Sequence, residues 1–471
     1  MYQYQGMEDT IAAIATATGP SGIGIVRMSG NKALAIADAV FKPARDAAPK
    51  PSVCKTHTVH YGNIVERQKT RVGEIIDEVL LTVLRAPRTY TGEDIIEINC
   101  HGGRVVLQNV LALLLRKGAR LAEPGEFTKR AFLNGRMDLT QAEAVLDMIH
   151  AKTSALLRVT AQQLKGALAL ELESIREDLM NVYIELEAVV NFPEDDVDSQ
   201  TQKKFFKSIK GALERVNHLL KSSRKGRLLR EGIRIVLCGK PNVGKSSLLN
   251  ALLKQPRAIV SDVAGTTRDT IEETAQIQGI PIQLVDTAGI LTPRDFIEEE
   301  AVKRSRLSMK SADLVLLILD NSQELSTEDF QIMENIKDQA LFVVLNKSDL
   351  KKRLAGAELK KRLPDKKCLK VSVLKAKGIQ ELEDAICQHA LQGEAFEHGE
   401  GLLLTNLRHI QTLEQCREKL QRACGHLQKK LSIEFVSDDV KLAVNDLDSV
   451  TGRNIDQDLL DRIFSHFCIG K

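Results

Sequence analysis

Residues 233–250 read IRIVLCGKPNVGKSSLLN, and this stretch decides the fold of the middle of the 471-residue chain. A short apolar run enters the pattern G-x-x-x-x-G-K-S, and a helix-like segment follows, which is the context that the pattern requires. Glycines in such a loop let backbone N–H groups face phosphate oxygens, and the helix N-terminus adds positive potential. The stretch therefore predicts a phosphate-binding loop in which Lys245 contacts the β- and γ-phosphates and Ser246 binds Mg²⁺.

Two downstream motifs complete the expected phosphate side of the site. Asp286-Thr287-Ala288-Gly289 follows an apolar run, so its carboxylate can hold the Mg²⁺ shell and its glycine N–H can sense the γ-phosphate. Thr266 and Thr267, within Gly265-Thr266-Thr267-Arg268, supply the hydroxyl that closes on Mg²⁺ when the γ-phosphate is present.

The motif Asn346-Lys347-Ser348-Asp349 predicts the base. It follows the strand-like run Leu341–Leu345, and its last carboxylate accepts two hydrogen bonds from guanine N1–H and N2–H₂. Adenine lacks this donor pair and would leave Asp349 unpaired, which discriminates by several kcal/mol. These motifs in this order predict a domain that binds and hydrolyses GTP.

One position departs from Ras-like hydrolases, because Ile290 stands where a glutamine would position water. Another group must supply charge and align the water: a partner's arginine, or a bound cation with a different polar residue. Asn242 is either a cation ligand or a loop-capping residue. Glu298 either orients water through a second group or is a solvated carboxylate at a helix start.

Size and composition set the surrounding expectations. A chain of 471 residues exceeds one compact core, so two to four domains are expected. The net charge of +3 argues neither for nor against nucleic-acid binding. Eight cysteines without a C-x-x-C pair disfavour a zinc site and suggest a reducing cytoplasm. The longest apolar run, Leu314–Leu319, is too short to cross a membrane and is expected to be a buried strand.

The pattern along the chain predicts a multidomain protein. Residues 1–125 have the short strands and turns of an α+β domain, and 126–230 have helical periodicity that ends in a basic linker, Lys221–Arg230. Strands and helices alternate over 231–391, as in a doubly wound α/β domain, and 392–471 are helical again. The α/β P-loop domain is therefore expected to be inserted into a discontinuous all-α domain.

Motifs outside the central domain resemble those of a known family. The chain resembles the bacterial tRNA-modification GTPases of the MnmE (TrmE) family over nearly its whole length. The G-domain motifs are shared by many GTPases, whereas the N-terminal motifs and the Cys-x-Gly-Lys terminus are specific. The motifs that carry the resemblance outside the G domain are Gly22–Arg27, Thr91–Asp94, His101–Gly103, Pro124–Phe127, Arg130–Asn134, Gln141–Ala144 and Cys468–Lys471.

The resemblance implies a fold, an activity and partners. The expected fold is an N-terminal tetrahydrofolate-binding domain, through which the chain dimerises, a helical domain and a TrmE-Era-like G domain. With the FAD protein MnmG, in a heterotetramer, such a cytoplasmic homodimer modifies C5 of the wobble uridine (U34) of certain tRNAs to a carboxymethylaminomethyl- or aminomethyl-type group. A 5-formyl- or 5,10-methylene-tetrahydrofolate supplies the one-carbon unit, and K⁺-stimulated GTP hydrolysis controls the cycle.

The resemblance also assigns residues. Folate contacts fall on Arg27, Glu97, Arg136 and Lys471, with Cys468 beside the folate pocket and Glu298 as the water-orienting residue. K⁺ ligands fall on Asn242, Ser261, Val263 and Thr266, and Mg²⁺ ligands on Ser246 and Thr267. Without the family match, Arg27 and Arg136 would be interpreted as surface cations. Glu97 would be interpreted as a residue on the solvent-exposed face of a strand. Together, motifs and resemblance assign nucleotide contacts to Asn242, Val243, Gly244, Lys245, Ser246, Ser247, Ser261, Asp262, Val263, Ala264, Gly265, Thr266, Thr267, Asp286, Thr287, Ala288, Gly289, Asn346, Lys347, Asp349, Ser372, Val373 and Leu374.

Two other functions compete with this interpretation. A ribosome-assembly GTPase would bind RNA without modifying it, but an Era-like chain should carry a G-x-x-G loop after its G domain. No G-x-x-G follows Asn346, and a Der-like chain should have two P-loops where this one has a single P-loop. A regulatory switch with a helical effector domain would leave the specific N-terminal motifs unexplained.

Overall fold

The structure is a computed structural model that describes residues 9–17, 19–45, 47–68, 71–191, 199–253, 272–286, 309, 311–392 and 402–471. Its contacts divide the chain into two compact units, each made of segments that are distant in sequence. Unit 1 comprises Met1–Leu146, Gln162–Leu213 and Gln415–Lys471, and unit 2 comprises Asp147–Ala161 and Glu214–Glu414. Within the described ranges, no helix has both the length and the apolar character needed to cross a bilayer.

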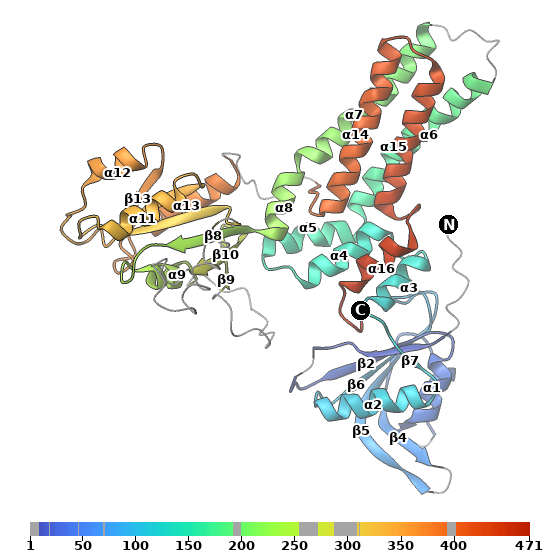
Figure 1. The fold of residues 1–471 in the computed structure, drawn as a ribbon. Coiled ribbons are helices and arrows are strands. Elements are labelled where there is room, and N and C mark those ends of the chain that lie inside the picture. The colour runs from blue at the N-terminus through green and yellow to red at the C-terminus, as the bar shows by residue number, and fades with distance from the viewer. Residues whose placement is uncertain are drawn as a thin grey trace. The chain divides into compact units, whose positions relative to one another are not determined.

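Unit 1 begins with a sheet of strand order β3-β4-β5-β6-β2-β1-β7 (Figure 1). Its strands are β1 (Ile11–Ile14), β2 (Gly24–Ser29), β3 (Phe41–Pro43), β4 (Thr58–Gln68), β5 (Arg71–Leu84), β6 (Ile95–Cys100) and β7 (Arg120–Leu121). Two helices, α1 (Ala33–Val40) and α2 (Arg104–Arg116), pack on one face of the sheet. The α+β character expected of this region is confirmed.

Strand alternation separates the two faces of this sheet. Val26, Met28, Ile96 and Ile98 are fully buried in the core with the two helices. Because successive residues of a strand point to opposite faces, Arg27 and its register partner on β6 lie on the face away from the helices. This alternation explains why charged residues interrupt the apolar strands β2 and β6.

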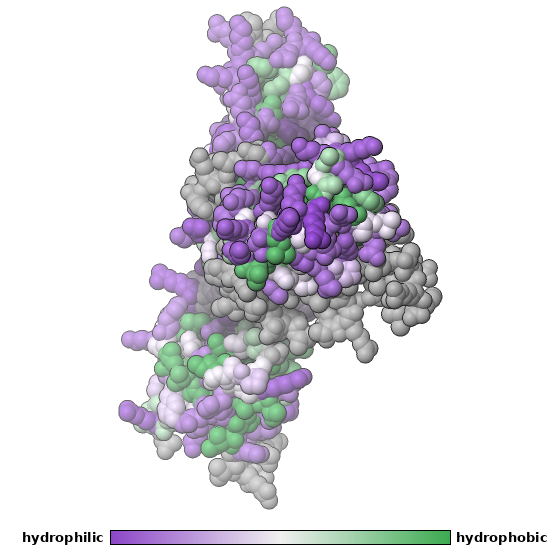
Figure 2. Space-filling view, turned by 90° about the vertical axis from the view of Figure 1, so that its left-hand side faces the viewer, coloured by the Kyte–Doolittle hydropathy of each residue, from purple (hydrophilic) through white to green (hydrophobic). Residues whose placement is uncertain are grey.

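The remainder of unit 1 is helical, and distant segments pack together in it. Helix α6 (Ala167–Asn191) packs along α15 (Ile433–Thr451), and Arg176 Nε donates to Asp448 Oδ1 at 2.5 Å across them. The far end of these helices, at the top of Figure 2, carries mainly hydrophilic side chains. The other helices of the helical part of the chain are α3 (Glu126–Leu133), α4 (Leu139–Ile149), α5 (Ser154–Leu164), α7 (Ser199–Lys221), α14 (Leu407–Gln428) and α16 (Gln457–Ser465). Of these, α5 lies mostly in unit 2, and α4, α7 and α14 are divided between the two units. The expected helical region on both sides of the α/β segment is confirmed.

Unit 2 contains a sheet of order β13-β12-β11-β8-β10-β9, in which β9 alone is antiparallel to its neighbour. The strands are β8 (Ile233–Cys238), β9 (Glu272–Ile277), β10 (Ile280–Asp286), β11 (Leu314–Asp320), β12 (Leu341–Asn346) and β13 (Lys367–Lys370). The helices within the α/β part of this unit are α9 (Lys245–Leu253), α11 (Thr327–Ile336), α12 (Gly356–Arg362) and α13 (Ile379–Ala390) among the described residues. Separate apolar cores cover the two faces, and β11 is buried throughout, as the sequence predicts.

The basic stretch before β8 is not a linker, which corrects the sequence prediction. It forms helix α8 (Ser223–Glu231). Leu229 is 1% exposed and packs against Ala155 and Leu156, while Gly226 lies so close to the Leu404 carbonyl that a Cβ would be 2.0 Å from its oxygen. The cations of α8 occupy the remaining positions, so the charge that suggested a linker belongs to an amphipathic helix.

Candidate functional site

The phosphate loop connects β8 to α9 in a backbone conformation that needs its glycines. Gly239 and Gly244 have φ values of +145° and +100°. A Cβ on Gly244 would lie 2.2 Å from the side-chain nitrogen of Asn346, so only glycine fits. Lys245 begins α9, and its Nζ donates to the carbonyls of Gly239 at 2.8 Å and Lys240 at 3.0 Å. The loop is thus closed around the ammonium that is expected to contact phosphate.

The base-recognition motif is fastened directly to this loop. Asn346, which is 3% exposed, donates from Nδ2 to the Val243 carbonyl at 2.9 Å. Lys347 Nζ donates to the Asn242 carbonyl at 3.0 Å and to Asp320 Oδ2 at 2.7 Å. Two motifs that are separate in sequence therefore form one site at the carboxyl ends of β8 and β12, which lie on either side of β11.

Asp349 is prepared to accept hydrogen bonds. Ser372 Oγ donates to its Oδ1 at 2.6 Å, and this hydrogen bond lowers the pKa of the Asp349 carboxyl below its usual value. The Val373 N–H faces Asn346 Oδ1 at 3.4 Å, and Leu374 is 88% exposed. Of the three predicted base-side residues, Ser372 therefore contacts the carboxylate that would read guanine, and Val373 contacts the first residue of the same motif.

Several predicted residues lie outside the described part of the chain. The strand β10 ends at Asp286, whose side chain is not described, and Thr287, Ala288, Gly289 and Glu298 follow it. The same holds for the segment with Ser261, Asp262, Val263, Ala264, Gly265, Thr266 and Thr267. Among the described residues no group of three or more His, Cys, Asp or Glu side chains could hold a metal. Two predicted cation ligands are described: Ser246 in the first turn of α9, and Asn242 with a left-handed φ of +64°.

A second cluster lies in unit 1, on the sheet face away from the helices. Arg27 forms an ion pair with Glu97, with a shortest N–O distance of 2.7 Å. The Arg27 guanidinium also lies 5.8 Å from the centre of the Tyr90 ring and 5.7 Å from that of Phe127. Stacking and pairing hold this cation in one orientation.

The C-terminal tail reaches the same cluster. Ile469 pairs with Pro124, and Gly470, at φ +95°, lies so close to Ile14 that a Cβ would be 2.4 Å from its carbonyl oxygen. The pKa of Lys471 is lowered by burial and by Arg27, with Glu97 opposing the shift. Cys468 is exposed, and its carbonyl accepts from the Gly125 N–H at 3.3 Å. Three of the four predicted folate residues are therefore gathered here.

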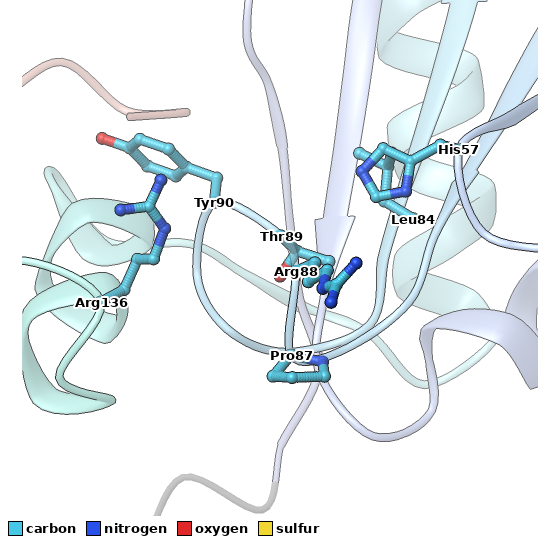
Figure 3. Close-up of a pocket in the computed structure, with 7 residues that line it drawn as sticks. All are labelled: His57, Leu84, Pro87, Arg88, Thr89, Tyr90 and Arg136. Carbon is cyan, nitrogen blue, oxygen red and sulfur yellow. The ribbon is translucent and has the colours of Figure 1, made fainter.

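The fourth, Arg136, lines an adjacent pocket of about 490 Å³ (Figure 3). Burial raises the pKa of Tyr90. A hydrogen bond with Thr128 and the charges of Arg27 and Arg136 oppose this shift, so both arginines lie near Tyr90. Tyr90 is a residue of this site that no sequence motif indicated, although it directly precedes the motif at 91–94. The pocket is lined by His57, Leu84, Pro87, Arg88, Thr89, Tyr90 and Arg136.

A strand–loop–helix with these glycines, joined to Asn346-Lys347-Ser348-Asp349, defines a P-loop GTPase domain. Two family models also match the chain: the MnmE helical domain over residues 139–468 and the GTP-binding protein TrmE N-terminus over residues 10–136. The chain belongs to the MnmE (TrmE) family of tRNA modification GTPases.

Relatives match over nearly the whole length. The tRNA modification GTPase MnmE of Alkaliphilus metalliredigens is 44% identical over 470 residues, which covers 99% of this chain and 100% of the relative. MnmE of Bacillus subtilis is 43% identical over 464 residues, which covers 98% of this chain and 100% of the relative. Among solved structures, Aquifex aeolicus Era bound to GDP and AlF4⁻ is 28% identical and covers 40% of this chain and 66% of its own, with a TM-score of 0.29.

Proposed function

We propose that this chain is a K⁺-stimulated GTP hydrolase that, with the FAD-dependent partner MnmG, modifies C5 of the wobble uridine of certain tRNAs with a folate-derived one-carbon unit. The observation that carries the proposal is the docking of the C-terminal Lys471 beside Arg27 and Glu97. A GTPase acting only as a switch has no use for such a cluster in a separate sheet domain. Cations suit folate carboxylates, and a carboxylate suits the donor edge of a pterin.

In the G domain, this chain's residues have separate tasks. Asp349 accepts from the guanine N–H groups, while Ser372 keeps its carboxyl ionised. Lys245 exchanges its two loop carbonyls for phosphate oxygens, and the N-terminus of α9 faces the same charge. Bound Mg²⁺ and K⁺ supply positive charge where negative charge develops during phosphoryl transfer. Asn242 and Ser246 are the described residues that we assign to hold them.

The folate-binding sheet face is also our proposed homodimer surface. Beside Arg27 and Glu97 it exposes Val59, Tyr61 and Leu80, with exposed fractions of 59%, 54% and 47%. Figure 2 shows hydrophobic side chains gathered over this domain, at the bottom of the view. An exposed apolar face next to a binding cluster is typical of a surface that a partner covers. We place the resulting homodimer, and its heterotetramer with MnmG, in the cytoplasm.

Calorimetry with 5-formyltetrahydrofolate tests the proposal on the full-length protein. We expect saturable binding to the native chain and to Arg45→Ala, an exposed arginine outside the cluster, and loss of binding in Arg27→Ala. GTP hydrolysis should continue in all three proteins. If the native chain hydrolysed GTP but bound no folate, the proposal that it uses a folate-derived one-carbon unit would be refuted.

A second measurement tests the modification itself. Transfer RNA from cells that lack this gene should lose the C5 group on the wobble uridine, and the native gene should restore it. An unchanged wobble uridine would favour the ribosome-assembly alternative.

A further inference from the structure

The pocket beside the folate cluster is lined by two arginines and a histidine and by no carboxylate. Its lining includes Arg88, Arg136 and His57, and none of its seven residues is acidic. Neither arginine forms a side-chain hydrogen bond or ion pair within the part of the chain that the structure describes. His57 Nδ1 contacts the Thr56 hydroxyl at 2.9 Å, and its Nε2 has no such neighbour among the described residues. The pocket is therefore arranged to receive negative charge.

The pocket continues directly from the folate cluster. In Figure 3, Tyr90 and Arg136 lie side by side at one end and His57 and Leu84 lie at the other, with Arg88, Thr89 and Pro87 between them. Tyr90 belongs to both sites, because its ring also stacks against Arg27. A ligand whose head is held at Arg27 and Glu97 would therefore extend past Arg136 toward Arg88 and His57.

The chemistry of folates matches this layout. A folate ends in a glutamate, and further glutamates attach through its γ-carboxyl, so each added residue brings one more carboxylate along a flexible chain. With the pterin donor edge at Glu97, we assign the first glutamate to Arg136, which lies beside Tyr90. The volume of about 490 Å³ is that of a small-molecule pocket, and Leu84 and Pro87 supply apolar walls for methylene groups.

We propose that this pocket binds the γ-linked glutamate chain of a polyglutamylated folate, with Arg88 and His57 contacting carboxylates beyond the one held by Arg136. The inference rests on the proposed folate function. It makes the polyglutamate form the preferred substrate class, since the monoglutamate leaves Arg88 and His57 without a ligand.

Calorimetry with two ligands, the monoglutamate and the triglutamate of 5-formyltetrahydrofolate, tests this on the full chain. We expect the native protein to bind the triglutamate about tenfold more tightly, because its added carboxylates would accept charge-assisted hydrogen bonds from Arg88. Arg88→Ala should remove most of this preference and change the monoglutamate affinity by less than about twofold. Arg88→Lys should keep part of the preference, because a cation remains. Arg45→Ala, an exposed arginine after β3, is the matched control and should behave as the native protein.

The outcomes separate the inference from the proposed function. Equal affinity of the native protein for both ligands would overturn the inference alone, as would an equal loss for both ligands in Arg88→Ala. If Arg88→Ala instead weakened tRNA binding and left both folates unaffected, the pocket would belong to RNA phosphates and the inference would be wrong. No binding of either folate to the native chain would refute the folate function together with the inference.

Discussion

Asn346 donates from its side-chain nitrogen to the main-chain carbonyl of Val243 at 2.9 Å. This hydrogen bond joins the first residue of the guanine motif to the phosphate loop, and it is buried. Because Lys347 contacts the neighbouring Asn242 carbonyl at 3.0 Å, base and phosphate recognition share one rigid unit. A change at either motif should therefore affect the other.

Gly244→Ala tests this connection. The new Cβ would meet Asn346 Nδ2 at 2.2 Å, and alanine at φ +100° adds a strain of about 1–2 kcal/mol. We expect GTP affinity to fall at least about tenfold, measured with a fluorescent GTP analogue. Gly211→Ala, in helix α7 with open space around its Cβ position, should leave GTP binding unaltered and slightly stabilise the fold. Native affinity in Gly244→Ala would show that the loop does not need this contact.

Asp349→Asn tests base recognition. The amide cannot accept from both guanine donors, so GTP affinity should fall about a hundredfold or more. Xanthosine triphosphate, which presents a carbonyl at C2, should gain affinity, because the amide can donate to it. Competition binding with both nucleotides measures this change in nucleotide preference. Asp338→Asn, at an exposed position just after a helix, is the control. An unchanged preference for guanine would contradict the assignment of Asp349.

Asn242→Ala tests the proposed K⁺ ligand. We expect the K⁺-stimulated rate of GTP hydrolysis to fall about tenfold to a hundredfold, because the cation would lose one oxygen ligand. Nucleotide affinity should remain nearly native, since Lys347 contacts the main-chain carbonyl of this residue and not its side chain. Hydrolysis rates in K⁺ and in Na⁺ provide the measurement. Equal K⁺ stimulation in the variant would remove Asn242 from the cation site.

Gly470→Ala tests the docked tail. A Cβ there would lie 2.4 Å from the Ile14 carbonyl oxygen, so the tail must shift and Lys471 must leave the cluster. We expect folate affinity to fall about tenfold or more with GTP hydrolysis preserved. Ile469→Ala, at a residue that is 52% exposed, should retain folate binding and serves as the control. Native folate binding in Gly470→Ala would mean that the tail does not form part of the site.

Glu126→Gln tests a buried charge cluster and predicts a pH dependence. Glu126 is 5% exposed and pairs with Arg120 at 2.6 Å and with the fully buried Arg130 at 2.9 Å. Burial alone would raise its pKa, but hydrogen bonds from Arg120, the Glu123 N–H and Arg130 lower it below the usual value of 4.5. The stabilisation is therefore present above pH 4.5 and is lost as pH falls through the lowered pKa.

We expect Glu126→Gln to reduce the free energy of unfolding by about 2 kcal/mol at pH 7, because Asp9 and Glu93 still neutralise Arg130. The difference in the free energy of unfolding between the variant and the native protein should become smaller below pH 4. Urea unfolding of both proteins at the two pH values measures it. A difference that stayed constant with pH would show that the Glu126 charge does not stabilise this cluster.

Much of the G domain is predictable from sequence because its chemistry is local. The glycines, Lys245 and Ser246 stand within one turn and one helix start, and Asp349 stands just after the strand β12. Backbone geometry over a few residues determines what such segments can bind. The same reasoning was wrong at α8. The basic composition of this stretch suggested a linker, whereas the buried Leu229 stabilises a helix.

The second site has a different origin. The sequence by itself determined the strands around Arg27 and Glu97, the phosphate loop and the helical periodicity, because each depends on residues near one another in the chain. Only the tertiary structure brought Lys471, from the opposite end of the chain, to Arg27 and placed Arg88 and Arg136 around one pocket. The physical reason is that strand register and long-range packing position these side chains, and neither leaves a local pattern in the sequence.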